Sequence, residues 1–208
     1  MTSPSTPSGY ILALYGPSGV GKSTISRLFS AMCAEHVVAV PILTTRGPKE
    51  GDDSEYVYVD REVFTASLSS GDIIASTRIP SATEERWYGY RDSDIRSAWD
   101  AGKIPVVITE IQLLEQFAAH YGRRSVLSFG LLPPGKSRRV MLSHLLYRLR
   151  NRGRETEGQI AERLRNAESD LDLCAERKDL FDQMIINDDL PSVLSVLRGR
   201  VLGSRSSV

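Results

Sequence analysis

The residues with the most specific chemistry lie in the stretch LYGPSGVGKST, residues 14–24. It fits the pattern G-x-x-x-x-G-K-[ST], whose fixed positions are Gly16, Gly21, Lys22 and Ser23. In such a loop, backbone N–H groups and the positive end of the following helix hold phosphates. The lysine reaches the β- and γ-phosphates, and the hydroxyl of the serine binds Mg²⁺. The stretch therefore predicts a site for ATP or a similar triphosphate together with its Mg²⁺.

The surroundings of this stretch match its expected context. A short apolar run at 10–15 precedes it and predicts a buried strand. A helical pattern follows, with apolar residues at Ile25, Leu28, Phe29 and Met32. A glycine-rich turn that arose by chance would lack this strand and helix. We expect these residues to contact the triphosphate: Gly16, Ser18, Gly19, Gly21, Lys22, Ser23 and Thr24.

A second group of charged residues lies at 145–165, in LLYRLRNRGRETEGQIAERLR. Six arginines surround Gly153, where one helix is predicted to end before another begins near 155–159. A mobile helical lid of this kind could close over a triphosphate and neutralise its charge. The alternative is a solvated face whose arginines pair with glutamates at helical spacings. The phosphate-binding loop favours the lid, at about 150–163.

Candidates for holding a second phosphate lie at 43–59, in LTTRGPKEGDDSEYVYV. Arg46 and Lys49 are two cations in one predicted turn, and the phenol of Tyr56 follows them. Glu110 comes directly after the apolar run at 104–109. A carboxylate there could hold the water shell of the metal or contact the acceptor. It could equally be a helix-start residue that complements the helix dipole.

The elements that must position these residues alternate along the chain. Five short apolar runs predict buried strands, at Tyr10–Tyr15, Val37–Val40, Ile104–Thr109, Ser125–Leu132 and Gln183–Asn187. Helical patterns separate them, which predicts an α/β fold with a mostly parallel five-stranded sheet flanked by helices. The stretch 42–102 departs from this alternation. We interpret it as an inserted lobe at the carboxyl edge of the sheet, with short strands in EYVYV and GDIIAS.

The composition sets limits on function. The 208 residues include 26 basic and 26 acidic ones, so the formal net charge is zero. The protein therefore has no overall positive electrostatic potential that would attract nucleic acid. No apolar run approaches the roughly 20 residues that span a membrane. Cys33 and Cys174 lack metal-ligand spacing and suit a reducing compartment. We expect a cytoplasmic protein that binds neither nucleic acid nor membrane, with a disordered tail at 1–9.

Taken in order, the motifs resemble the guanylate kinase family. The pieces are GPSGVGKST, TTRGPKEGD with EY, WYGY, RLRNRGRETE with ERL, and INDDL, spread from residue 10 to about 202. The resemblance implies a P-loop NTPase fold in a single domain, 10–208. Its core would comprise 10–41 and 103–208, and its acceptor-binding lobe 42–102. It also implies an ATP- and Mg²⁺-dependent kinase of a nucleoside monophosphate, as a monomer or small homo-oligomer.

The resemblance also assigns roles to individual residues. Arg152 and Arg163 would come from the lid and, with Lys22, act on the moving phosphoryl group. Arg148 would belong to the ATP site, and Asn187 in NDDL would lie beside the donor adenine. The phosphate of a small-molecule acceptor would be held by Arg46, Lys49, Tyr56 and Tyr88, with Ala75, Tyr90 and Glu110 also in the acceptor site.

Several positions depart from the family pattern. Lys49 stands in place of a phosphate-binding arginine, and Ile42 stands in place of a phosphate-binding serine. Ala75 occupies the position of the family's guanine-binding glutamate, and Tyr90 occupies the position of a small hydroxyl residue. A carboxylate facing guanine is how such a site rejects other bases, so its loss puts GMP in question. Glu84 or Glu85, from a segment that is longer than in the family, could replace it.

Three alternatives follow from these departures. The ribose 1,5-bisphosphate phosphokinase family also lacks this glutamate, which favours a sugar phosphate as the acceptor. A non-catalytic guanylate kinase-like binding module typically has a damaged phosphate loop, whereas Lys22 and Ser23 are intact here. A P-loop GTPase or ATPase switch would need a guanine-specificity motif that the sequence lacks.

Overall fold

The computed structural model describes residues 9–48, 55–79, 85–153 and 155–203. Lys49, Glu84 and most of the predicted tail lie outside these ranges. A five-stranded parallel sheet has the order β2-β7-β1-β8-β9. Its strands are β1 (Ile11–Tyr15), β2 (Val37–Ala39), β7 (Ile104–Ile108), β8 (Val126–Leu132) and β9 (Gln183–Ile186). The five predicted strands and the predicted α/β class are therefore confirmed.

The contacts of the chain group its described residues into two compact units. The first unit comprises residues 1–13 and 34–127, and the second comprises 14–33 and 128–208. The phosphate-binding motif falls in the second unit, and the segment predicted as an inserted lobe falls in the first. Each unit therefore carries one of the two predicted phosphate sites.

The first unit contains a four-stranded sheet of order β4-β3-β6-β5. Its strands are β3 (Ile42–Thr44), β4 (Tyr56–Tyr58), β5 (Ile73–Ile79) and β6 (Arg86–Arg91). β3 pairs parallel with β4 and antiparallel with β6, which pairs antiparallel with β5. The apolar stretches predicted β4 and β5, whereas β3 and β6 were missed because short, mixed strands carry no clear alternation.

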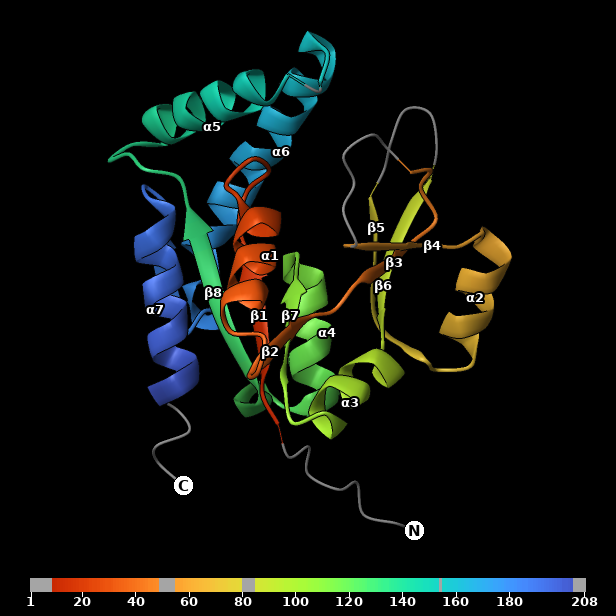
Figure 1. The fold of residues 1–208 in the computed structure, drawn as a ribbon. Coiled ribbons are helices and arrows are strands. Elements are labelled where there is room, and N and C mark those ends of the chain that lie inside the picture. Colours follow the sequence, from red (N-terminus) through yellow and green to blue (C-terminus); the bar gives the residue numbers. More distant parts are fainter. Residues whose placement is uncertain (1–8, 49–54, 80–84, 154, 204–208) are drawn as a thin grey trace. The chain divides into compact units, whose positions relative to one another are not determined.

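One face of this sheet packs against α2 (Arg61–Ser69), as Figure 1 shows. Phe64 of α2 is buried against Leu43 and Ile73, and its ring lies 6.0 Å from that of Trp87. Because side chains alternate along a strand, the opposite face presents the neighbours of these residues. It carries Thr44, Tyr56, Ala75, Thr77, Tyr88 and Tyr90. The apolar cluster under α2 thus turns the polar face of the sheet away from the helix.

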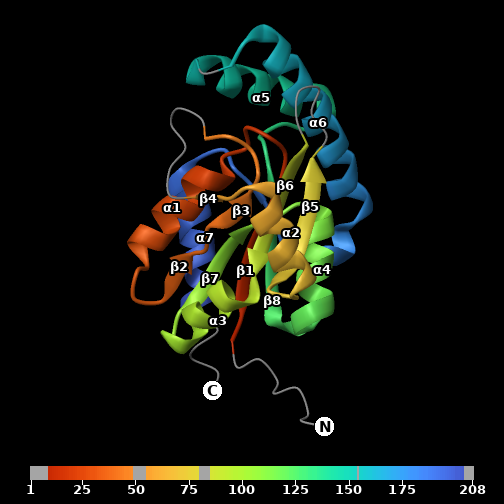
Figure 2. The same cartoon turned by 90° about the vertical axis from the view of Figure 1, so that its right-hand side faces the viewer.

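Two further helices complete the first unit, namely α3 (Asp92–Asp100) and α4 (Ile111–Tyr121), followed by the 3-10 turn Arg123–Ser125. α4 packs along β5, as Figure 2 shows from the side. The Gln116 amide accepts a hydrogen bond from the Ser76 N–H (2.9 Å) and donates one to the Ser76 carbonyl (2.8 Å). One side chain thereby satisfies both backbone groups of Ser76 and ties β5 to α4.

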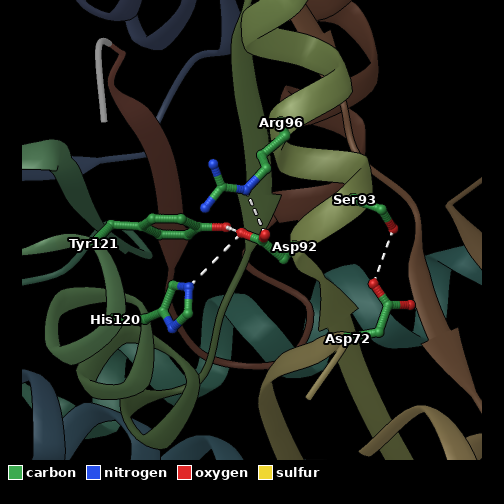
Figure 3. A network of polar contacts seen from close by, with 6 residues as sticks. All are labelled: Asp72, Asp92, Ser93, Arg96, His120 and Tyr121. Carbon is green, nitrogen blue, oxygen red and sulfur yellow. Dashed lines mark hydrogen bonds and ion pairs between the residues drawn. The ribbon is translucent and has the colours of Figure 1, made fainter. Parts of the chain in front are cut away.

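A polar network joins α3 to the end of α4 (Figure 3). The Asp92 carboxylate accepts a hydrogen bond of 2.6 Å from the Tyr121 hydroxyl and another from Arg96, and His120 Nε2 lies 3.7 Å away. Burial alone would raise the pKa of Asp92, but these hydrogen bonds and the nearby Arg96 guanidinium lower it below its ordinary value. Asp92 is therefore a charged acceptor at neutral pH.

Replacement of Tyr121 by phenylalanine is expected to lower the free energy of unfolding by about 1 kcal/mol, because a charge-assisted hydrogen bond is lost from a partly exposed carboxylate. A carboxyl group whose pKa is lowered by folding stabilises the protein fully at pH values above its pKa in the unfolded state. This stability is lost as the pH falls through the pKa of the group in the folded state. The difference should therefore shrink in acid. Urea denaturation measures it, with Tyr147→Phe as the control because Tyr147 is exposed. Equal stability of Tyr121→Phe and wild type near neutral pH would contradict the expectation.

The second unit contains α1 (Lys22–Met32), α5 (Arg138–Arg152), α6 (Glu157–Glu176), the 3-10 turn Lys178–Leu180 and α7 (Leu190–Gly203). α5 and α6 pack against each other (Figure 1), and so do α1 and α7 (Figure 2). α5 ends at Gly153, whose φ of 67° lies in the left-handed region that glycine favours. Thr156 and Gln159 begin α6 with a reciprocal capping box. The arginine-rich segment is thus two helices with a sharp connection.

Candidate functional site

The loop 16–21 joins β1 to α1 and turns with three glycines of positive φ, at Gly16, Gly19 and Gly21. A Cβ atom on Gly21, whose φ is 108°, would lie 2.9 Å from Asn187 Nδ2. A Cβ atom on Gly19 would lie 3.2 Å from Leu149. The positive φ angles therefore favour glycine at these positions, and the close side chains add to the cost of a Cβ atom.

Lys22 and Ser23 lie at the start of α1, directly after this loop. The ammonium of Lys22 donates to the carbonyl oxygens of Gly16 (2.5 Å) and Pro17 (3.2 Å). Ser23 and Thr24 are exposed in the first turn, where the backbone N–H groups of a helix begin without intrahelical acceptors. The Ser23 hydroxyl is a hard oxygen ligand and fits the predicted role of binding Mg²⁺.

Two residues from elsewhere in the second unit hold the backbone of the loop. Asn187 Nδ2 donates a hydrogen bond of 2.6 Å to the Val20 carbonyl. Arg148 donates one of 3.2 Å to the same carbonyl and one of 2.6 Å to the Asn187 carbonyl. Arg148 and Asn187, both predicted in the ATP site, thus lie together against the phosphate loop.

The helix α6 contacts the loop at Ser18 from two places. Arg163 donates a hydrogen bond of 3.2 Å to the Ser18 hydroxyl and lies 3.3 Å from the buried Glu155 carboxylate. Asp170, two turns further on, accepts hydrogen bonds from the Ser18 N–H and the Tyr15 hydroxyl. Burial raises the pKa of Asp170, although nearby Lys22 opposes this. The structure therefore brings the predicted Arg163 to the phosphate loop.

Arg152, the other predicted lid arginine, is exposed in the last turn of α5. Its neighbour Arg150 forms an ion pair of 2.9 Å with Glu157. Some arginines of this segment thus pair with glutamates, as the solvated-face alternative requires, while Arg163 contacts the loop, as the lid requires.

In the first unit, Arg46 is a buried cation, with 7% of its surface exposed. Its guanidinium carbon lies 4.4 Å from the ring centroid of Tyr56 and 5.7 Å from that of Tyr58. Its backbone N–H donates to the Thr44 hydroxyl (3.2 Å), and its side chain donates to the Gly47 carbonyl (3.0 Å). These cation–π contacts and hydrogen bonds restrain the guanidinium, whose planar fork suits bidentate recognition of a phosphate.

Two phenols accompany Arg46 on this face of the sheet. Burial, followed by the nearby Glu55 carboxylate, raises the pKa of Tyr56 to about 12. Burial also raises the pKa of Tyr88, although Arg46 opposes the shift. Both phenols are therefore protonated at neutral pH and can donate hydrogen bonds. The structure brings three predicted acceptor residues together, while Lys49 lies outside the described residues.

Ala75 and Tyr90 face each other across β5 and β6, as paired residues on one face of the sheet. Tyr90 is 1% exposed, and its ring lies 5.4 Å from that of Phe117. Its hydroxyl donates to the Ile108 carbonyl (2.9 Å) and accepts from the Ile108 N–H (3.0 Å). The Tyr90 side chain thus fills the space beside Ala75 and is fixed to the end of β7.

Glu110 lies at the start of α4, where its side chain makes no capping hydrogen bond. It accepts a hydrogen bond of 3.2 Å from the Thr77 hydroxyl on β5. Glu85 forms ion pairs with Arg61 of α2 (3.2 Å) and Arg78 of β5 (3.1 Å). Glu110 therefore lies with the acceptor residues, whereas the Glu85 carboxylate is paired with cations of α2 and β5.

Comparisons with known proteins agree on one family. The guanylate kinase family model matches residues 8–201. A guanylate kinase of Nocardia farcinica is 34% identical over 92% of this chain and 93% of its own length, and one of Trichormus variabilis is 29% identical over 94% and 91%. The chain belongs to the guanylate kinase family.

A solved guanylate kinase of Anaplasma phagocytophilum has the same fold. It matches 94% of this chain and 86% of its own with a TM-score of 0.68, at 23% sequence identity. The predicted P-loop NTPase fold and the predicted family are thereby confirmed. Among the described residues, no helix is both long enough and apolar enough to cross a lipid bilayer.

Two acidic residues near the phosphate loop, Glu155 and Asp170, are not among the predicted site residues. Glu155, whose side chain is 8% exposed, contacts Arg163, and Asp170 contacts Ser18. The signal for Asp170 was its spacing, because Arg163 and Asp170 are seven residues apart and therefore share one face of α6. A lone acid within a helix rich in charges gives no other signal.

Proposed function

We propose that this protein is an ATP-dependent kinase that transfers the γ-phosphoryl group to the phosphate of a (deoxy)nucleoside monophosphate. The observation that carries the proposal is the intact phosphate loop, with Lys22 and Ser23 at the start of α1 and Arg163 on Ser18. A module that only bound a partner would not need these groups. Membership of the guanylate kinase family supports the same activity.

In this mechanism the acceptor phosphate oxygen attacks the γ-phosphorus directly, without a covalent enzyme intermediate, while the bond between the γ-phosphorus and the β–γ bridging oxygen breaks and ADP leaves. Lys22, Arg152 and Arg163 would neutralise the charge that spreads over the γ-phosphoryl oxygens. When bound with ATP through the Ser23 hydroxyl, Mg²⁺ would supply further positive charge on the phosphates. The task of the protein is then to position the two phosphates in line.

At the acceptor side, Arg46 would grip the phosphate of the acceptor, and the phenols of Tyr56 and Tyr88 would donate hydrogen bonds to it. The support is the buried guanidinium, which lies 4.4 Å from the Tyr56 ring centroid and interacts with both protonated phenols. Lys49 would add a cation, without the bidentate geometry of an arginine. Glu110, which accepts a hydrogen bond from Thr77 of the four-stranded sheet, would lie in the acceptor site as well.

The proposed enzyme reads the base of its acceptor differently from one with a carboxylate in this site. Ala75 offers no acceptor for guanine, and the Tyr90 hydroxyl is already bonded to both backbone groups of Ile108. The pairing of Glu85 with Arg61 and Arg78 also makes it a poor replacement. The same Tyr90 observation favours the second candidate, a kinase of a bare sugar phosphate such as ribose 1,5-bisphosphate.

We therefore expect GMP, if it is used, to be discriminated from other acceptors less sharply than a carboxylate permits. One hydrogen bond to a charged group is worth about 1.5–3 kcal/mol, which corresponds to roughly ten- to a hundredfold in preference. The test is kcat/KM with ATP for GMP, dGMP, AMP, CMP, UMP, dTMP and ribose 1,5-bisphosphate.

Each outcome of this panel has a definite meaning. A GMP preference above about a thousandfold over every other acceptor would contradict the altered base recognition, because it exceeds what one such bond supplies. Highest activity with ribose 1,5-bisphosphate would establish the sugar phosphate candidate. Absence of transfer to every acceptor, with ATP binding intact, would indicate a non-catalytic binding module.

A further inference from the structure

The Val20 carbonyl, in the middle of the phosphate loop, is held by two side chains. Asn187 Nδ2 lies 2.6 Å from it and Arg148 Nη1 lies 3.2 Å from it. Arg148 Nη2 also donates to the Asn187 backbone carbonyl (2.6 Å), so the Arg148 side chain holds the backbone of the residue whose amide holds Val20. Val20 is 0% exposed and Asn187 7% exposed, which keeps water from competing for these bonds.

The neighbouring backbone groups are fixed as well. The Val20 N–H donates to the Pro17 carbonyl (3.1 Å), and the Gly21 carbonyl accepts from the Ile25 N–H (2.9 Å). A trans peptide is planar, so its carbonyl and its N–H point in opposite directions. With the Val20 carbonyl held by Asn187 and Arg148, the Gly21 N–H must point to the other side of the loop.

We propose that Asn187 and Arg148 are positioning residues, which fix the Val20–Gly21 peptide so that the Gly21 N–H faces the phosphates. This inference rests on the proposed function, because it assumes that the loop binds a triphosphate. It differs from the role that the resemblance implies for Asn187, which is contact with the donor adenine. The two roles act on different parts of ATP.

The physical need for such a brace comes from Gly21. A glycine turns between backbone conformations more freely than any other residue, and Gly21 already has a φ of 108°. If the Val20–Gly21 peptide flipped, its carbonyl oxygen would face the negative phosphates in place of an N–H donor. Two donors on the Val20 carbonyl oppose that flip, and the loop is then ordered before the ligand arrives.

The test uses two ligands that share phosphates but differ in the base, namely ATP and inorganic tripolyphosphate, each with Mg²⁺ and without an acceptor. Calorimetric titration gives Kd for wild type and for Asn187→Ala. We expect the variant to bind both ligands about 10- to 100-fold more weakly, by the same factor, because a buried carbonyl loses its partner. Arg148→Met removes both arginine donors and should weaken both ligands in the same way.

Asn166→Ala is the matched control, since Asn166 is an exposed asparagine of α6 in the same unit. Thermal unfolding of each variant shows whether the fold is kept. Loss of ATP binding with tripolyphosphate binding unchanged would overturn the inference and assign Asn187 to the base. Unchanged binding of both ligands by Asn187→Ala and by Arg148→Met would also overturn it. If the wild-type protein bound both ligands but phosphorylated no acceptor, the proposed kinase function would be contradicted. The inference about Asn187 and Arg148 would not be affected.

Discussion

Replacement of Lys22 by alanine is expected to lower kcat/KM for phosphoryl transfer by about 10³-fold. A single preorganised charge on a moving phosphoryl group is worth this much in related transfers. In the structure the ammonium lies on the Gly16 and Pro17 carbonyls. We expect it to exchange these carbonyls for phosphate oxygens when ATP binds. The measurement is ADP release with the best acceptor of the panel, over a range of ATP concentrations.

The fold should survive this substitution, because Lys22 is only partly buried and its hydrogen bonds go to loop carbonyls. Lys178→Ala is a suitable control, since Lys178 is exposed in the same unit. Circular dichroism and thermal unfolding establish that both variants are folded. Activity of a folded Lys22→Ala protein within a few-fold of wild type would refute the kinase proposal.

The elements that the sequence predicted are those with continuous apolar runs. All five strands of the parallel sheet were predicted within a residue or so, since strands buried on both faces need apolar residues throughout. The helix α3 was missed because only a few of its residues, among them Ile95 and Ala98, are buried. Short elements of mixed polarity depend on tertiary packing, which local patterns do not contain.

The site shows a similar limit. The phosphate loop is a local motif, so Lys22 and Ser23 could be predicted from adjacent residues alone. The positions of Arg148 and Asn187 depend on contacts with Val20 from 128 and 167 residues away, which spacing does not reveal. Likewise, the family resemblance assigned Tyr90 to the acceptor site, but the contacts of its hydroxyl with Ile108 could be found only in the structure.

Replacement of Arg46 by alanine is expected to raise KM for the acceptor by about 10²-fold and to change KM for ATP little. The Arg46 guanidinium lies beside Tyr56 and acts on Tyr88, and losing charge-assisted hydrogen bonds to a phosphate costs about 3 kcal/mol. Arg46→Lys keeps the positive charge but lacks the planar guanidinium. Its KM for the acceptor should therefore lie between that of wild type and that of Arg46→Ala. Initial rates measured with each substrate varied in turn separate the two KM values.

The matched control for this experiment is Arg61→Ala, which removes an exposed arginine of the same unit that pairs with Glu85. Its kinetics should equal those of wild type, because the α2 face of the sheet is opposite the face that carries Tyr88. Since Arg46 is buried against Tyr56, thermal unfolding must show that Arg46→Ala is folded before its kinetics are interpreted. An effect confined to KM for ATP would mean that the donor and acceptor sites are assigned the wrong way round. If KM for the acceptor were unchanged, the phosphate of the acceptor would have to bind away from the polar face of the four-stranded sheet.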